Sequence, residues 1–390
     1  MITREDVREL SQFRFKTDEK CAVSFYFQPS PPRNKSHREE TILAKELVRN
    51  ALRQIAMNGN DHCARIDLEK IAAIVEKMHG NQARAKAIFA YGRENFWREF
   101  DLPPDLPSTQ LVINRRFHLK PLAAILRMQP RLGVILVDRQ RARLFDLRMD
   151  EINESVDFFH PLSRRGKSDG FDGYDAGHAE RRVADDVLHH FRGVASVLKE
   201  QVEKGAWEKL IVGCQEKNWL DFEPQFHSLV RQRVLGHFSV NVATAGVEQI
   251  REHAYHVLRE ASDHEHQELV KEVLRHARGH HRGVTGLRRV LRALQVGEVQ
   301  VLVMGDNYHA RAVECTNCGY VDSHIIRYCP ACGRSTLELE DVSDALIPMA
   351  IRRDIQIFFV KGNTELDRAG NIGALLRFRA ERNQPMAAAS

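Results

Sequence analysis

The sequence predicts a multidomain protein of mixed α+β and α/β class. A single hydrophobic core rarely grows beyond about 250 residues, so a chain of 390 residues has room for two or three domains. Apolar runs typical of strands alternate with runs of helical periodicity, which favours sheets covered by helices. Two Cys-x-x-Cys motifs, separated by ten residues, interrupt the last of these regions. We therefore expect three domains, the third with an inserted metal-binding ribbon.

The first predicted domain covers residues 1–107. Its expected elements are a strand at 21–27 and helices at 38–55 and 68–79, and the helices show apolar positions at helical spacing. The run Leu-Pro-Pro-Asp-Leu-Pro at 102–107 ends this region, because consecutive prolines cannot continue a helix or a central strand. This proline cluster is the clearest candidate for a linker.

The second predicted domain covers residues 108–246. Two short apolar runs, 133–137 and 142–145, flank a polar turn and predict a β-hairpin. A basic, glycine-rich loop at 161–177 follows. An amphipathic helix then carries apolar residues from Val183 to Val202 at steps of three and four. The remaining expected elements are a buried strand at 210–214 and a helix at 226–235.

The third predicted domain covers residues 247–390. A long helical stretch from residue 247 leads to a helix at 284–294, which Gly297 can close as a C-terminal cap. Apolar runs predict three strands, at 299–304, 355–360 and 375–378.

The two Cys-x-x-Cys motifs lie inside this third domain and predict a zinc ribbon at 313–335. Their cysteines are Cys315, Cys318, Cys329 and Cys332. A short turn brings both thiolates of each motif to one side, and Gly319 and Gly333 allow the tight backbone that the turn needs. Four sulfurs complete a tetrahedral site and leave no open position, so the expected Zn²⁺ is structural and not catalytic. The alternative is four ordinary cysteines.

The remaining features indicate a cytoplasmic protein. Cys21, Cys63 and Cys214 are scattered, which fits a reducing compartment and not a disulfide framework. The N-terminus has no apolar secretory core, and no apolar stretch of about 18 residues is present, so no membrane is expected as a partner. The net charge of +5 is compatible with a polyanionic partner but does not require one.

Three segments, in order along the chain, resemble the archaeal and eukaryotic class-1 peptide-chain release factor and Pelota family. The segment GLRRVLRALQVGEVQVLVM resembles the start of that family's last domain, and AGNIGALLRFR resembles the signature before its final strand. Archaeal members place a four-cysteine ribbon between the two. The segment GVILVDRQRARLFDL resembles the hairpin before the family's functional loop. The resemblance is greatest to the bacterial branch. It implies an RNase H-like middle domain and a C-terminal domain similar to kink-turn-binding ribosomal proteins.

The chain departs from this family where release chemistry is carried out. Release factors carry Gly-Gly-Gln in the loop that enters the peptidyl-transferase centre, and that tripeptide is absent here; residues 173–178 read Gly-Tyr-Asp-Ala-Gly-His in its place. The stop-codon motif Asn-Ile-Lys-Ser is also absent. Pelota lacks Gly-Gly-Gln too. The resemblance therefore implies a factor that binds the ribosomal A site without release chemistry, so no catalytic residue is assigned.

The basic loop and the helix after it are the expected RNA-binding region. Arg and Lys bind phosphate, glycine allows close approach, and aromatic or imidazole rings stack on exposed bases. The candidate residues are Arg164, Arg165, Lys167, Gly173, Tyr174, His178, Arg181 and Arg182. The alternative is a solvated loop beside a charged helix face. A second hypothesis makes Asp175 and His178 an acid–base pair. Seven histidines between residues 253 and 281 fit no metal motif and indicate a polar helix face.

The leading hypothesis is a ribosome-binding factor that acts in stalled-ribosome rescue or in hibernation. A Balon-like hibernation factor, delivered with EF-Tu, is the family example of the second role. Expected partners are ribosomal RNA of both subunits and a translational GTPase such as EF-Tu; DNA is not expected. Two alternatives remain open. One is a peptidyl-tRNA-hydrolysing release factor that uses residues 173–178, and the other is an RNA-binding protein that acts away from the ribosome.

Overall fold

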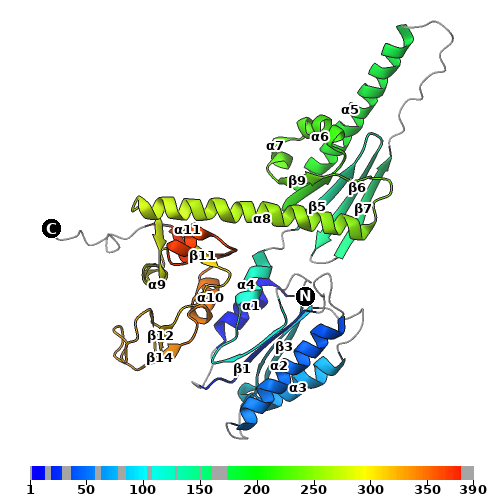
Figure 1. Cartoon of the computed structure of the whole chain (residues 1–390). Helices are drawn as coiled ribbons and strands as arrows, with labels where there is room; N and C mark the ends of the chain where they lie inside the picture. The colour runs from blue at the N-terminus through cyan, green and yellow to red at the C-terminus, as the bar shows by residue number, and fades with distance from the viewer. Residues whose placement is uncertain are drawn as a thin grey trace. The chain divides into compact units, whose positions relative to one another are not determined.

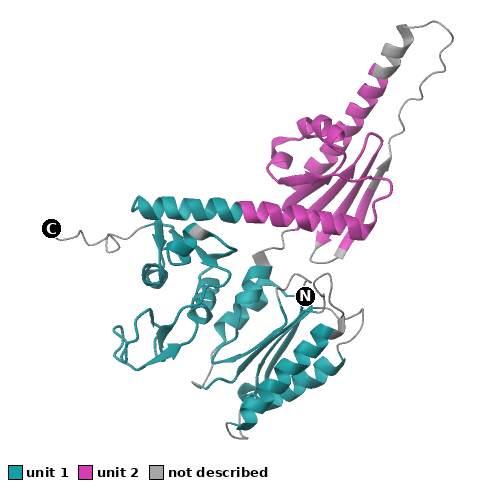
Figure 2. Cartoon of the chain, in the orientation of Figure 1, with its two compact units in different colours: residues 1–127, 265–390 teal, residues 128–264 magenta. Residues whose placement is uncertain are grey.

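The protein is described here from a computed structural model, which covers residues 2–13, 19–28, 37–57, 63–77, 85–102, 108–127, 131–148, 151–159 and 174–378. The chain forms two compact units (Figure 2). Unit 1 joins residues 1–127 and 265–390, and unit 2 contains residues 128–264. In the described part of the chain, no helix is long and apolar enough to span a membrane.

The N-terminal part of unit 1 is an antiparallel sheet of order β3-β2-β1-β4. Its strands are β1 (Ala22–Phe27), β2 (Ala85–Tyr91), β3 (Phe96–Leu102) and β4 (Gln110–Asn114). Every residue of β1 is buried because β1 is central and both faces of the sheet are covered. On one face, the two helices α2 (His37–Met57) and α3 (Arg65–Lys77) pack on apolar side chains that include Phe25 and Ile88.

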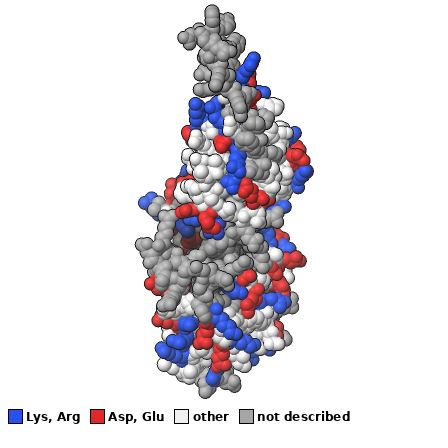
Figure 3. Space-filling model, turned by 90° about the vertical axis from the view of Figure 1, so that its right-hand side faces the viewer, with Lys and Arg blue, Asp and Glu red and all other residues white. Residues whose placement is uncertain are grey.

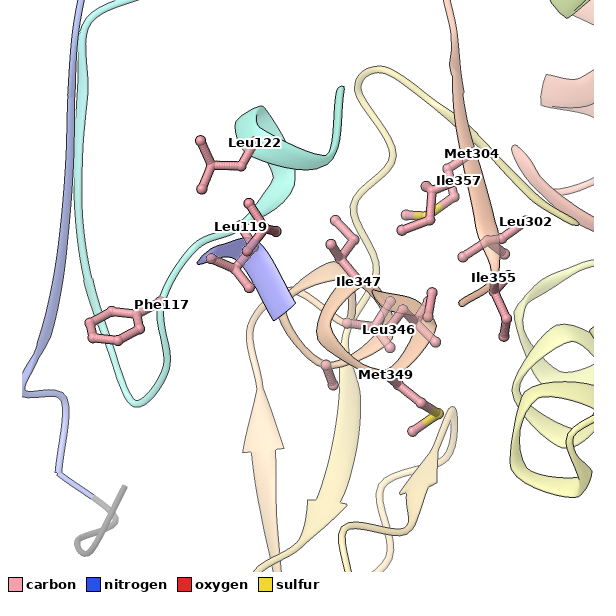
Figure 4. Packing of buried hydrophobic residues seen from close by; sticks show 14 of the residues in the cluster. Phe117, Leu119, Leu122, Leu302, Met304, Leu346, Ile347, Met349, Ile355 and Ile357 are labelled. Carbon is pink, nitrogen blue, oxygen red and sulfur yellow. The ribbon is translucent and has the colours of Figure 1, made fainter. Parts of the chain in front are cut away.

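The other face of this sheet packs in a larger apolar cluster. Helix α1 (Arg4–Gln12), whose start is closed by a capping box between Thr3 and Asp6, contributes Val7 and Leu10. The segment before α4 (Lys120–Arg127) contributes Phe117 and Leu119. Figure 4 shows Leu119 and Leu122 between Phe117 and the side chains of Leu346, Ile347 and Met349 on α10 (Ser343–Arg352), and all of these residues belong to one apolar cluster. The N-terminal sheet and the C-terminal part of unit 1 therefore share one core.

The C-terminal part of unit 1 is a mixed four-stranded sheet of order β10-β16-β11-β15. These strands are β10 (Gly283–Thr285), β11 (Val299–Gly305), β15 (Gln356–Val360) and β16 (Ile372–Leu376). Helices α9 (Leu287–Val296) and α10 supply apolar residues to one cluster, while α8 (Val247–Arg278) and α11 (Thr364–Arg368) supply residues to another. Gly297 has a φ of 85° and caps α9, as the sequence predicted.

A three-stranded sheet of order β13-β12-β14 is inserted between β11 and α10. We call it the cysteine ribbon: β12 (Ala312–Cys315), β13 (Val321–Asp322), β14 (Thr336–Leu339) and the turns between them. Its strands are all antiparallel. Strands β12 and β14 can be followed in Figure 1, and the assignment of residues 313–335 as a zinc ribbon stays a prediction.

Unit 2 is a five-stranded sheet of order β7-β6-β5-β8-β9. Its strands are β5 (Leu132–Val137), β6 (Arg141–Arg148), β7 (Glu151–Phe159), β8 (Lys209–Gly213) and β9 (Val234–Phe238). Strands β5, β6 and β7 pair antiparallel, whereas β8 pairs parallel with both β5 and β9. The predicted hairpin is confirmed by the pairing of β5 with β6.

Helices cover both faces of the unit 2 sheet. Ile135 and Val137 of β5 point into a cluster with α5 (Tyr174–Glu203), α6 (Glu216–Phe222) and α7 (Ser228–Arg231). Val134 and Leu136 belong to the opposite cluster, which the first half of α8 completes. This alternation follows the period of two in a strand. Helix α8 continues without a break from residues of unit 2 into residues of unit 1 (Figure 2).

Most expected elements are present, but one helix prediction is wrong. Residues 226–235 form only the four-residue helix α7, and β9 begins at Val234. The β-branched Val234 and the close packing of Gly236 against Val257 suit a strand, and the parallel pairing with β8 outweighs the helical spacing. The helix expected at 284–294 begins at Leu287, because Val284 lies in β10. Sequence analysis also missed α1, β2, β3, β4, α4, β7, α6, β10, α10 and α11.

The predicted domain boundaries can be compared with the sheets. The proline cluster at 103–107 lies outside the described residues, and β4, which follows it, pairs with β1. The boundary at 246/247 lies where α8 begins. The three-domain division, the RNase H-like middle domain and the kink-turn-protein-like last domain stay predictions.

The expectation that no disulfide forms is wrong for one pair of cysteines. Cys21 and Cys63 are joined by a disulfide, with their Cα atoms 5.5 Å apart. Cys21 directly precedes β1, and Cys63 lies two residues before the start of α3, so packing of α3 on the sheet brings the two cysteines together. Spacing along the sequence cannot show this contact.

Candidate functional site

The cysteine ribbon gathers the four predicted metal ligands. Cys315 ends β12, Cys318 follows it in a tight turn, and Cys329 and Cys332 form the second turn. In each turn, a glycine N–H donates to the carbonyl of the first cysteine: Gly319 to Cys315 at 3.0 Å, and Gly333 to Cys329 at 2.9 Å. Both glycines have φ near +70°, which side chains disfavour. The two turns are therefore built alike.

The four sulfur atoms fit one tetrahedral metal ion. All of them lie within 4.8 Å of one another. The Cys315–Cys332 and Cys318–Cys329 sulfur pairs are 3.4 and 3.6 Å apart. A zinc–sulfur bond of about 2.3 Å in a tetrahedron requires sulfur–sulfur edges of about 3.8 Å. The backbone N–H of Ala331 also donates to the sulfur of Cys329 at 3.3 Å, as expected for a thiolate ligand.

Contact between four sulfurs also changes their acidity. The backbone N–H of Arg334, with further donors, lowers the pKa of Cys332 to about 6. At Cys318, the backbone N–H of Tyr320 lowers the pKa, but burial and the neighbouring sulfurs outweigh it and raise the pKa to about 12. Neighbouring thiolates resist a second negative charge, and a divalent cation removes that resistance. The cluster can therefore hold one metal ion in a closed site.

Two side chains near the sulfurs have other partners. His324, considered as a substitute ligand, is exposed and lies 3.1 Å from the carboxylate of Asp322. Glu314, next to Cys315, is buried, and its carboxylate accepts a 2.5 Å hydrogen bond from Arg116. Burial raises the pKa of Glu314, while the charge of Arg116 opposes this rise. Sequence analysis missed Glu314, because its partner lies 198 positions away.

The predicted RNA-binding region is only partly described. Arg164, Arg165, Lys167 and Gly173 lie outside the described residues. Helix α5 begins at Tyr174, so the loop predicted to reach residue 177 ends earlier, and both Tyr174 and His178 lie in the first turns of the helix. Arg181 and Arg182 follow on α5 and are exposed. The RNA-binding role of these residues stays a prediction.

The histidines of α8 do not gather around a common point among the described residues. His253 stacks on Phe238 with ring centroids 5.1 Å apart, and His266 meets the ring of Phe358 edge-on. His256 pairs with Glu260 one turn away. Of these three histidines, two contact aromatic rings and one pairs with a carboxylate on the same helix.

The face that Figure 3 shows has no patch of a single charge sign among its described residues. Lys and Arg side chains are interspersed there with Asp and Glu over the described surface. Alternating signs of this kind are typical of a solvated surface.

Comparison with known proteins shows a similarity to archaeo-eukaryotic release factors. Residues 118–266 match the model of bacterial archaeo-eukaryotic release factor family 10. The chain is 25% identical over 315 residues to peptide chain release factor subunit 1 of Pyrococcus abyssi, with 71% of this chain and 74% of the relative covered. It is 23% identical over 312 residues to the protein of the same name from Thermococcus sibiricus, with 72% and 74% covered.

Solved structures give a partial likeness. The archaeal translation termination factor aRF1 covers 97% of this chain and 99% of its own length at 16% identity, with a TM-score of 0.26. The ribosome-bound archaeal Pelota, solved with ABCE1, covers 97% and 95% at 14% identity, with a TM-score of 0.41. The sequence matches carry the comparison, and they confirm the predicted resemblance to this family. Residues 118–266 of this chain are therefore similar to the bacterial archaeo-eukaryotic release factors of family 10, and the chain as a whole is similar to archaeal peptide chain release factor subunit 1.

Proposed function

We propose that this protein is a ribosome-binding translation factor of the release factor and Pelota type that does not hydrolyse peptidyl-tRNA. One observation carries the proposal: residues 118–266 match a release factor family, yet the sequence contains no Gly-Gly-Gln. The family match supports binding in the ribosomal A site, and the missing tripeptide argues against release chemistry. Its proposed place of action is the cytoplasm.

The proposed role is protection of idle ribosomes in hibernation, or rescue of stalled ribosomes. In both roles a factor occupies the A site without releasing a peptide. The proposed partners are ribosomal RNA of both subunits and a translational GTPase such as EF-Tu. Ribosomes recovered with the tagged protein, imaged by cryo-electron microscopy, separate the roles: empty ribosomes support hibernation, and ribosomes with peptidyl-tRNA and mRNA support rescue.

In this proposal, the basic residues before and on α5 contact RNA. Reversing Arg164, Arg165 and Lys167 to Glu should weaken co-sedimentation with ribosomes about tenfold or more at moderate salt, because each phosphate contact adds to the salt-dependent affinity. A matched control reverses Lys45, Arg49 and Arg53 of α2, which changes the net charge equally. Equal binding by both triple variants would reject this assignment.

The ribbon has a supporting part in this function. We propose that Cys315, Cys318, Cys329 and Cys332 bind Zn²⁺, because four thiolates at these distances suit a tetrahedral, closed site. The ion supplies a cross-link when bound. Elemental analysis of the purified chain should give about one zinc per chain, and Cys329→Ser should lose it.

The competing function is peptidyl-tRNA hydrolysis by residues 173–178. A release assay on programmed ribosomes decides between the two. Release by the wild-type protein that is lost in Asp175→Asn or His178→Ala would establish the enzyme. An absence of release, with ribosome binding intact, supports the proposed non-catalytic factor.

A further inference from the structure

The base of the cysteine ribbon contains a charge pair that links two distant parts of unit 1. Glu314 precedes the ligand Cys315, and its side chain is 11% exposed. Arg116, which donates to it at 2.5 Å, lies between β4 and α4. A carboxylate this buried is costly without a counter-charge. Arg116 therefore supplies the positive charge that stabilises the buried carboxylate of Glu314 at the end of β12.

Further polar contacts join the same two regions. The guanidinium of Arg115 donates to the carbonyl of Glu338 in β14 at 3.4 Å. At the start of α10, Asp344 accepts a 2.7 Å hydrogen bond from Asn114 and lies 2.9 Å from the ring of His118. The segment 114–118, which we call the docking segment, thus contacts β12, β14 and α10.

The first cysteine turn also lies next to Glu314. The N–H of Cys315 donates to the carbonyl of Tyr320 at 2.8 Å, so the first cysteine turn fixes the end of β12. A side chain at Gly319 would start only 3.9 Å from the carboxylate of Glu314, which places this turn next to the carboxylate. Ordering of the turn by a metal therefore also orders Glu314.

We propose that metal binding by the ribbon and binding of the docking segment are thermodynamically linked through Glu314 and Arg116. Arg116 is a positioning residue for the metal centre: it touches no ligand sulfur but holds the strand that ends in Cys315. Such coupling is reciprocal, so the factor by which bound metal strengthens docking is also the factor by which docking strengthens metal affinity. This linkage does not depend on the proposed ribosomal function.

The first arm of the test measures Zn²⁺ affinity by competition with a chromophoric chelator. In the full chain, Arg116→Ala should weaken Zn²⁺ binding about fivefold or more, within the usual range of coupling between sites. Arg116→Lys should restore part of the loss, because the positive charge remains. The matched control is Arg65→Ala, which removes an arginine paired with Glu69 inside α3 and should leave the affinity unchanged.

The second arm measures amide hydrogen exchange of residues 114–118 in the wild-type chain with and without Zn²⁺. Removal of the metal should speed exchange in this segment, and in Arg116→Ala the exchange should be fast in both states. The proposal is overturned if a folded Arg116→Ala chain binds Zn²⁺ within twofold of wild type. It is equally overturned if Zn²⁺ leaves exchange in the wild-type segment unchanged, a result that does not depend on any variant folding.

Discussion

The two units stabilise their sheets by different means. Unit 2 contains a single cysteine, Cys214, and apolar side chains cover both faces of its sheet. Burial and then the charge of Glu216 raise the pKa of Cys214 to about 12, so it remains an unreactive thiol. Unit 1 contains the other six cysteines, and all of them lie in close groups: one disulfide and one four-sulfur cluster.

The difference follows from the size of the structures that the cysteines join. The cysteine ribbon has few buried apolar side chains besides its sulfurs, namely Ala312, Val313 and Val321. So small a core cannot offset the conformational entropy of its chain, and cross-links compensate in structures of this size. The unit 2 sheet buries enough apolar surface to need none. We therefore expect chelators and reductants to lower the stability of unit 1, and substitutions in the apolar core to lower the stability of unit 2.

The largest expected effect is that of metal removal. Structural zinc in small domains contributes about 10 kcal/mol or more to folding, so chelation or Cys329→Ser should unfold the ribbon locally. Amide exchange should become fast across residues 312–339, while the thermal transition of unit 2 stays unchanged. A cooperative loss of both units on chelation would show that they do not fold separately.

A core truncation in unit 2 should have the next largest effect. Phe191 of α5 is fully buried, and its ring lies 5.2 Å from that of Phe222. Phe191→Ala should cost about 3–5 kcal/mol in urea unfolding, because the lost contacts leave a cavity. The control is Leu220→Ala on the neighbouring α6, where a side chain that is 66% exposed should change stability by less than about 1 kcal/mol. A similar loss at both positions would contradict the assigned core.

The disulfide should contribute less than this core residue. Cys21 and Cys63 close a loop with a sequence separation of 42, and such a cross-link typically stabilises by about 2–4 kcal/mol through the unfolded chain. Cys63→Ser should lower the unfolding free energy of unit 1 by this amount under oxidising conditions. Dithiothreitol should cleave the disulfide of the wild-type chain and lower its free energy of unfolding to that of the variant. If dithiothreitol has no effect on the wild type, the cross-link does not contribute to stability.

Sequence patterns predicted the parts of this fold that are stabilised locally. Strands β5, β8 and β11 are predominantly apolar runs, and the long helices α5 and α8 follow helical spacing. The four cysteines signal their site by spacing alone, since one metal ion requires both turns. In these cases, the residues that determine the local structure are close to one another in the sequence.

Features that depend on distant contacts were not predictable in this way. Strand β7 carries acidic residues at Glu151 and Glu154, and its pairing with β6 outweighs their low strand propensity. The Arg116–Glu314 pair and the Cys21–Cys63 disulfide each join residues that only the folded chain brings together. The family resemblance predicted a four-cysteine ribbon in this region but carried no information about the Arg116–Glu314 pair at its base.

The smallest expected effect concerns a buried charge beside the disulfide. Asp67, four residues after Cys63 on α3, is 2% exposed, and its Oδ2 atom has no hydrogen-bond partner among the described residues. Burial raises the pKa of Asp67, although the backbone N–H of Gly92 and the charge of Lys70 oppose the rise. We therefore expect the charged form of this side chain to destabilise the N-terminal sheet slightly.

The sign of this effect gives a test by pH. Because the folded state holds the proton more tightly than the unfolded state, this group's contribution to stability is complete below its unfolded pKa of about 4. That contribution is lost as pH rises through the folded value. The asparagine introduced by Asp67→Asn does not titrate. The free energy of unfolding of this variant, relative to that of the wild type, should therefore rise between pH 4 and pH 7, by less than about 1 kcal/mol. Exposed Glu69→Gln is the control, and it should show no such gain. A loss of stability at pH 7 in Asp67→Asn would mean that the charged carboxylate stabilises α3.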